Sequence, residues 1–224
     1  MKIKDFSKIY IAILFLHLIT IYKEDYGPLY IISKPMLVFC LLSFWVHRSS
    51  LIELKGKHSF SLALLFCLTG DILLMFQNPE WLFYAGMGAF GIAHVFFFLF
   101  YLNQSGRGLH QVGFMVGGLL TIISATILYY LYPLQMPMEL AVYFYAFLFG
   151  LHLIWNAGSA FTLKGGYLTA FGGATLFLIS DMLLLWFKLQ AISNPISHTA
   201  VMVTYGIGIF FITTGIVRKE SLVF

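Results

Sequence analysis

Three charged side chains lie inside apolar stretches of this chain: Lys34, Asp71 and Asp181. If all three are ionised and close together, they leave one uncompensated negative charge, which is unfavourable in a low-dielectric interior. Two neighbouring carboxyls in such surroundings tend to share one proton, so that one is a carboxylic acid and the other a carboxylate. Such a pair can act as acid and base, as in glycosidases. The sequence therefore predicts a catalytic pair, Asp71 and Asp181, beside Lys34, and leaves open which aspartate holds the proton.

Other polar residues in apolar stretches are candidates for binding or orienting a substrate: Tyr84, His94, Tyr205, His152 and Asn156. Tyr84 and His94 are predicted to share one helical face, and His152 and Asn156 to share another with Tyr145. Packing inside a helix bundle also favours polar faces of this kind, so both interpretations stay open.

Metal chemistry has little support in the sequence. No HxxxH pair lies on a single predicted helix, and Cys40 and Cys67 fall in separate apolar stretches. We therefore predict no metal and no cofactor, and packing roles for both cysteines.

The composition narrows the class of protein. Of the 224 residues, 60% are hydrophobic and 10% are charged, against about 25% charged in soluble domains. This excludes a soluble enzyme, a disordered chain and a nucleic-acid binder. The sequence predicts an all-α integral membrane protein that crosses the bilayer several times, most simply the plasma (bacterial inner) membrane.

Eight stretches match the roughly 20 apolar residues that a spanning helix needs, and Gly, Pro, Asn or Ser marks most breaks between them. They are 8–22, 28–47, 58–77, 81–103, 110–132, 137–161, 167–188 and 195–217. With the N-terminus inside, ten Lys and Arg residues lie on the inner side and only Lys23 and Lys188 on the outer side. This bias predicts that both termini are cytoplasmic.

The predicted spans place the three charges at similar depths. Lys34 is six residues from the outer end of its span, Asp71 six and Asp181 seven, which is roughly 9–10 Å in each case. Similar contexts around the two aspartates, Gly70-Asp71-Ile72-Leu73-Leu74 and Ser180-Asp181-Met182-Leu183-Leu184, predict a parallel four-plus-four helix repeat. The chain is then one membrane domain, 1–224, with half-repeats of about 1–105 and 106–224.

Several motifs resemble the lysoplasmalogenase family of multi-pass membrane proteins, also called YhhN-like. They are Ser33-Lys34-Pro35, Thr69-Gly70-Asp71-Ile72-Leu73-Leu74, Phe83-x-x-Gly86 with Phe90-x-x-x-His94, and Gly173-Ala174-x-x-Phe177-x-x-Ser180-Asp181. The resemblance runs from about Ser33 to Gly215. One departure is that family members often carry a Gln soon after the tyrosine of the last span, whereas Tyr205 is followed by Gly206-Ile207-Gly208.

The resemblance implies hydrolysis of the vinyl ether bond of a lysoplasmalogen, a lysophospholipid of the membrane. The products would be a fatty aldehyde and glycerophosphoethanolamine or glycerophosphocholine. This chemistry needs a carboxylic acid to protonate carbon and a carboxylate to balance positive charge, which the aspartate pair supplies. A proton-coupled transporter of a small solute is the alternative, because intramembrane acids and helix repeats suit transport as well. A scaffold without chemistry is a third interpretation.

Overall fold

Helices make up all the regular secondary structure in the part of the chain that the structure describes. The structure is a computed structural model, and it describes residues 1–22, 27–76, 79–104, 110–131 and 138–220. The eight helices are α1 (Ile3–Ile21), α2 (Gly27–Ser49), α3 (Lys57–Leu73), α4 (Trp81–Gln104), α5 (Gln111–Leu131), α6 (Met138–Leu163), α7 (Gly166–Leu189) and α8 (Pro195–Glu220).

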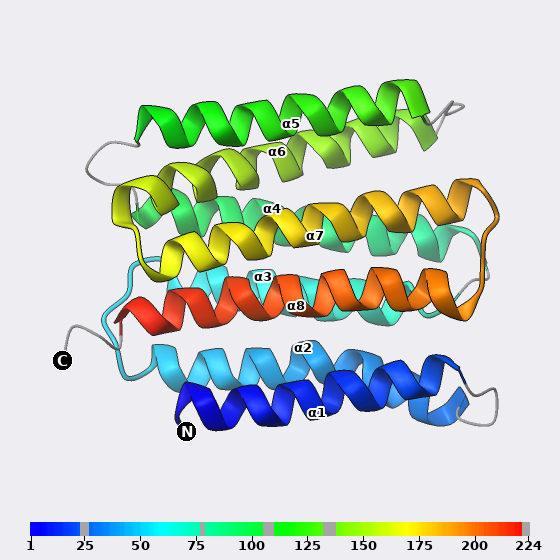
Figure 1. Ribbon diagram of the computed structural model, residues 1–224, viewed down its shortest axis with the longest axis horizontal. Helices are drawn as coiled ribbons and strands as arrows, with labels where there is room; N and C mark the ends of the chain where they lie inside the picture. The colour runs from blue at the N-terminus through cyan, green and yellow to red at the C-terminus, as the bar shows by residue number, and fades with distance from the viewer. Residues whose placement is uncertain (23–26, 77–78, 105–109, 132–137, 221–224) are drawn as a thin grey trace.

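The helices lie side by side with alternating direction, so that α1 begins and α8 ends at the same end of the bundle (Figure 1). We call this the terminal end and the opposite one the far end. Consecutive helices pack together within each half of the chain, α1 to α4 and α5 to α8, and the halves meet through α4 with α6, α2 with α8 and α1 with α8.

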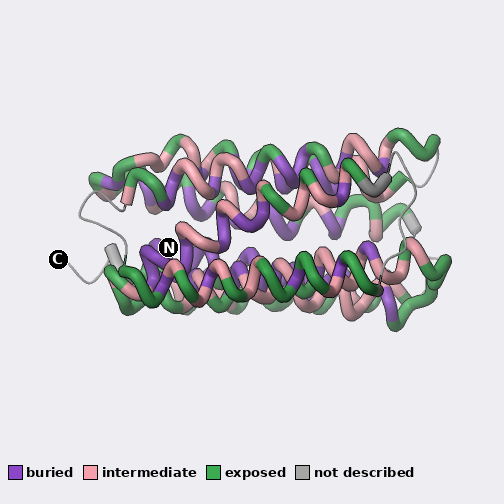
Figure 2. The backbone as a smooth tube through the Cα atoms, turned by 90° about the horizontal axis from the view of Figure 1, so that it is seen from above, coloured by how far each residue is buried: buried purple, intermediate pink, exposed green. Residues whose placement is uncertain are grey.

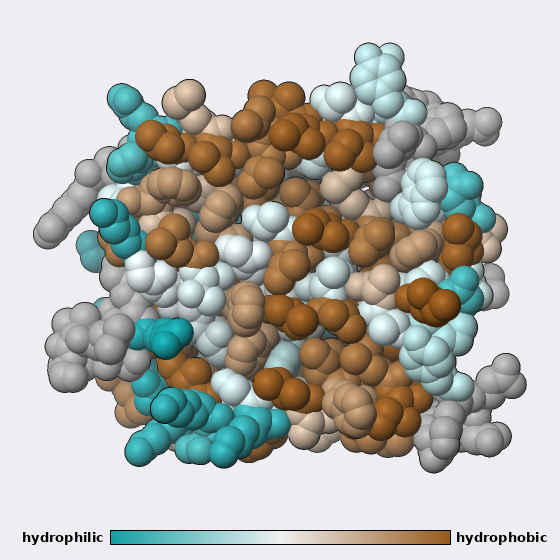
Figure 3. All heavy atoms as spheres, in the orientation of Figure 1, coloured by the Kyte–Doolittle hydropathy of each residue, from teal (hydrophilic) through white to brown (hydrophobic). Residues whose placement is uncertain are grey.

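Apolar side chains cover the outside of the bundle as well as its core. Exposed residues line the outward sides of the helices and buried residues lie between them (Figure 2). On the face seen in Figure 3, apolar side chains fill the middle and hydrophilic ones gather toward the two ends. An outer surface of exposed Leu, Ile and Phe, including Phe15, Leu119 and Phe144, is what a lipid environment stabilises. The protein is therefore an integral, multi-pass membrane protein.

Within the described ranges, six helices are long and apolar enough to cross a membrane by length and composition: α2, α4, α5, α6, α7 and α8. Two of the eight predicted spans fall outside this group. Helix α1 carries Lys4, Asp5 and Lys8 near its start, and α3 has only 17 residues. That α1 and α3 also cross stays a prediction.

Helix α3 ends earlier than the sequence suggested. The predicted span reaches Gln77, whereas the helix ends at Leu73 and the backbone N–H of Leu74 bonds the Gly70 carbonyl. Asp71 is therefore two residues from the end of its helix rather than six from the end of the span. The depth of Asp71 below the far end therefore depends on the position of α3 within the bundle, and the length of the helix alone does not determine this depth.

Candidate functional site

Asp71 lies at the contact between α3, α2 and α8. It is only 2% exposed, and the Tyr205 hydroxyl on α8 donates a 2.8 Å hydrogen bond to its Oδ2. Lys34 on α2, 7% exposed, interacts electrostatically with the carboxyl. No ion pair within 4.0 Å joins Lys34 to either aspartate, all three being in the described ranges. Lys34 is thus a nearby counter-charge rather than a direct salt-bridge partner.

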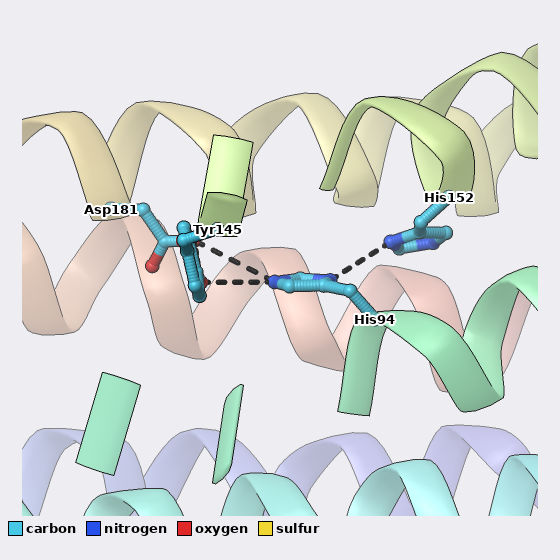
Figure 4. A network of polar contacts seen from close by, with 4 residues as sticks. All are labelled: His94, Tyr145, His152 and Asp181. Atoms are coloured by element: carbon cyan, nitrogen blue, oxygen red, sulfur yellow. Dashed lines mark hydrogen bonds and ion pairs between the residues drawn. The ribbon is translucent and has the colours of Figure 1, made fainter. Parts of the chain in front are cut away.

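Asp181 on α7 stands at the end of a chain of polar side chains from α6 and α4 (Figure 4). The Tyr145 hydroxyl donates a 2.7 Å hydrogen bond to Asp181 Oδ2, and His94 Nε2 lies 3.0 Å from the Tyr145 oxygen. His94 Nε2 is also 3.8 Å from Asp181 Oδ2. On the other side of its ring, His94 Nδ1 lies 3.1 Å from His152 Nδ1.

The two aspartates belong to one electrostatic cluster although their hydrogen-bond partners differ. Asp181 interacts electrostatically with Asp71, and the buried thiol of Cys67 interacts with both carboxyls. The rings of Phe90 and Phe177 contact Tyr205, with centroids 5.9 Å and 5.1 Å away. Phe177 also lies 5.1 Å from the His94 ring. Aromatic rings therefore contact the residues around Asp71 as well as those around Asp181.

Small residues beside the aspartates allow this packing. A Cβ on Gly70 would come within 2.6 Å of the Phe90 ring, so a larger residue before Asp71 would require that ring to move. Ser180, just before Asp181, donates its hydroxyl to the Val201 carbonyl at 3.0 Å and so ties α7 to α8. A Cβ on Gly173 would come within 2.5 Å of the Gly208 carbonyl, so these two helices touch backbone to backbone there.

Asp181 lies at the wall of an apolar pocket enclosed by α4, α5, α6, α7 and the end of α3. Fourteen of its eighteen lining residues are apolar. The polar ones are Thr121, Ser124, Tyr145 and Asp181. The hydroxyls of Thr121 and Ser124 bond carbonyls of their own helix. Tyr145 and Asp181 are therefore the groups in this pocket that can meet a ligand chemically. Asp71 does not line it.

The predicted orienting residues have different positions. His94, His152 and Tyr205 each lie in a chain that ends at an aspartate, as described above. Asn156 lies one turn beyond His152, with its Nδ2 3.4 Å from the Ala170 carbonyl, so it contacts the backbone of α7 rather than an aspartate.

Tyr84 is not part of the site. It is half-buried, its ring packs on Phe83, and it does not line the pocket. Tyr84 and His94 point in different directions from α4. Ten residues at 100° per residue place the two side chains about 80° apart around the helix axis.

Two residues that the sequence did not assign to the site belong to it. The spacing of Tyr145 places it on the same face of α6 as the candidate His152, but nothing in the sequence showed that α6 faces Asp181. Cys67 is four residues before Asp71 and therefore on the same face of α3. A cysteine in an apolar stretch is ordinary, so only this spacing indicated that Cys67 lies near the site. Among the described residues, no group of three or more His, Cys, Asp or Glu is placed to hold a metal ion.

Comparison with known proteins identifies the family. No curated protein and no solved structure matches the chain. The model of the YhhN family matches residues 29–216, which include both aspartates, Lys34 and all the aromatic and histidine residues described around them. The chain therefore belongs to the YhhN family, which is the lysoplasmalogenase family.

Proposed function

We propose that the protein hydrolyses the vinyl ether bond of lysoplasmalogens and releases a fatty aldehyde and a glycerophospho-ethanolamine or -choline. Membership of a family associated with hydrolase activity supports this. The observation that carries the proposal is a single carboxyl, Asp181, in the wall of a largely apolar pocket inside a membrane protein. The apolar lining suits the alkyl chain of one lipid, with the reacting bond beside the carboxyl.

The two aspartates take different roles because their neighbours differ. Each carboxyl accepts one tyrosine hydroxyl, but Asp71 also has Lys34 nearby, which stabilises a negative charge on it. A proton shared by the pair is therefore better placed on Asp181, which faces the pocket. This assigns Asp181 as the acid and Asp71 as the ionised partner.

The reaction then needs only these two groups and water. Asp181 gives its proton to the alkene carbon that is not bonded to oxygen, which leaves an oxocarbenium ion on the other carbon. Water adds to that carbon, its proton is released to solvent, and the hemiacetal breaks down to aldehyde and alcohol. General acid–base catalysis of this kind contributes about 10²–10⁴ in rate. The ionised Asp71 also balances the positive charge of the intermediate.

The test uses purified protein in detergent and two lipids that differ in one bond. We expect aldehyde from a 1-alkenyl lysolipid and no cleavage of the 1-alkyl analogue, because a saturated ether cannot be protonated on carbon to give an oxocarbenium ion. In D₂O the aldehyde, trapped at once by reduction, should carry one deuterium at C2. Cleavage of a 1-acyl lysolipid at the same rate, or no aldehyde at all, would contradict the proposal.

A further inference from the structure

When Asp181 is ionised, the hydrogen-bonded chain that ends at it runs in one direction. Tyr145 donates its only O–H to Asp181, so its oxygen accepts from His94 Nε2. A neutral His94 with hydrogen on Nε2 accepts at Nδ1, so the hydrogen in the 3.1 Å contact belongs to His152 Nδ1. His152 therefore presents Nε2 as an acceptor, and that atom is buried without a partner among the described residues.

The same chain also works in the opposite direction. If Asp181 is protonated, it donates to Tyr145, Tyr145 donates to His94 Nε2, and His94 Nδ1–H donates to His152 Nδ1. His152 then carries hydrogen on Nε2. The two arrangements differ by one proton, which enters at His152 Nε2 and arrives at Asp181 while each residue in between passes one proton on. Every residue between the ends is neutral before and after.

Beyond His152, α6 continues with buried polar atoms toward the terminal end. Asn156 Oδ1 and Ser159 Oγ are fully buried, have no partner in the described part of the chain, and follow His152 at i+4 and i+7 on the same face. Ser159 is four residues from Leu163, the last residue of α6, or roughly 6 Å along the axis. Buried polar atoms of this kind are commonly bridged by water. They lead from His152 toward the terminal end of the bundle.

We propose that His152, His94 and Tyr145 form a proton relay that reprotonates Asp181 after each turnover, drawing the proton from water on the Asn156 and Ser159 side. On the pocket side Asp181 faces the substrate, and Tyr145 is its hydrogen-bond donor. The proton that the adding water loses goes to solvent, so a full cycle consumes no net proton. The relay rests on the proposed hydrolysis, but the second of the two tests below does not depend on it.

The first test compares His152→Asn with the wild type by rapid mixing with excess 1-alkenyl lysolipid. The Asn amide can still donate to His94 but cannot change tautomer, so it keeps the hydrogen bond and blocks the relay. We expect one aldehyde per active site at the wild-type rate, followed by turnover slowed about tenfold or more. His152→Phe should behave in the same way. Thr213→Val, which removes a fully buried hydroxyl bonded within α8, should match the wild type.

Two results would overturn the relay. If His152→Asn turns over at the wild-type rate, Asp181 regains its proton by another route. If its first turnover is slowed as much as later ones, His152 only supports the structure. The second test needs no activity: the infrared C=O band of the Asp181 carboxylic acid, identified by its loss in Asp181→Asn, should exchange in D₂O more slowly in His152→Asn. Equal exchange rates would overturn the relay, whereas slower exchange in a protein that forms no aldehyde would reject only the hydrolase.

Discussion

At the scale of single residues, the neighbours of Asp71 and Asp181 decide what each carboxyl does. Asp71 has a tyrosine hydroxyl and a lysine nearby and is closed off from the pocket, whereas Asp181 has a tyrosine linked to two histidines and faces the pocket. The sequence contexts of the two are nearly the same. The acid could therefore be assigned only once the partners from α6 and α8 were known.

Replacing Tyr145 with Phe should lower steady-state aldehyde release by about 10–100-fold, because the change removes both the donor to Asp181 and the middle of the relay. Tyr130→Phe is the matched control, since Tyr130 is 76% exposed on α5. Rates measured on the two purified variants, with equal thermal stability, make the comparison. Full activity in Tyr145→Phe would remove this tyrosine from the mechanism.

How much of the site could be predicted depends on the kind of residue. Lys34, Asp71 and Asp181 were visible because charge inside a membrane is unfavourable and therefore rare. Tyr145 and Cys67 were not assigned, because tyrosines and cysteines are ordinary in apolar helices and only the contacts between helices show their role. Tyr84 lies outside the contacts described here for the related reason that a helical face drifts over ten residues.

At the scale of elements, helix existence could be predicted and helix ends could not. Every predicted span coincides with a helix, because long apolar stretches between turn residues have few other stable structures. The end of α3 was misplaced, since apolar residues continue past Leu73 and hydropathy does not distinguish a turn from a helix there. Likewise, no pattern of hydropathy indicates that α7 and α8 touch at Gly173 and Gly208.

Gly173→Ala should destabilise the protein by about 1–3 kcal/mol, because the added methyl group would press on the backbone of α8. Gly172→Ala is the matched change one residue earlier, where a Cβ meets nothing within 4 Å. It should be neutral or stabilising by about 0.5–1 kcal/mol, as alanine favours helix over glycine. Thermal unfolding in detergent measures both. Equal unfolding temperatures for the pair would show that the α7–α8 contact is looser than described.

At the scale of the whole molecule, the halves of the chain contribute matching positions to the two aspartates. Lys34 is the eighth residue of α2 and Tyr145 the eighth of α6, and these helices precede those of Asp71 and Asp181. Each aspartate also has a partner from the other half, Tyr205 on α8 and His94 on α4. This arrangement agrees with the predicted half-repeats, which remain a prediction.

The number of membrane crossings can be measured at the loops that flank α3. A reporter of sidedness inserted after Ser50 and another after Pro79 should report opposite sides if α3 crosses, with the Ser50 reporter on the side of both termini. The reason is that the charge bias places Arg48, Lys55 and Lys57 with the N-terminal lysines. Reporters after Lys164 and Asn194, which flank the long apolar helix α7, are the control. The same side for Ser50 and Pro79 would mean that α3 enters the membrane without crossing it.

Protonation of the vinyl ether by Asp181 can be tested by aldehyde release from a 1-alkenyl lysolipid by purified Asp181→Asn. An amide has no acidic proton to give, so we expect a loss of about 10²-fold or more with thermal stability retained. Asp5→Asn makes the same chemical change at an exposed residue near the start of α1 and should keep the wild-type rate. Wild-type aldehyde release by folded Asp181→Asn would mean that Asp181 is not the acid.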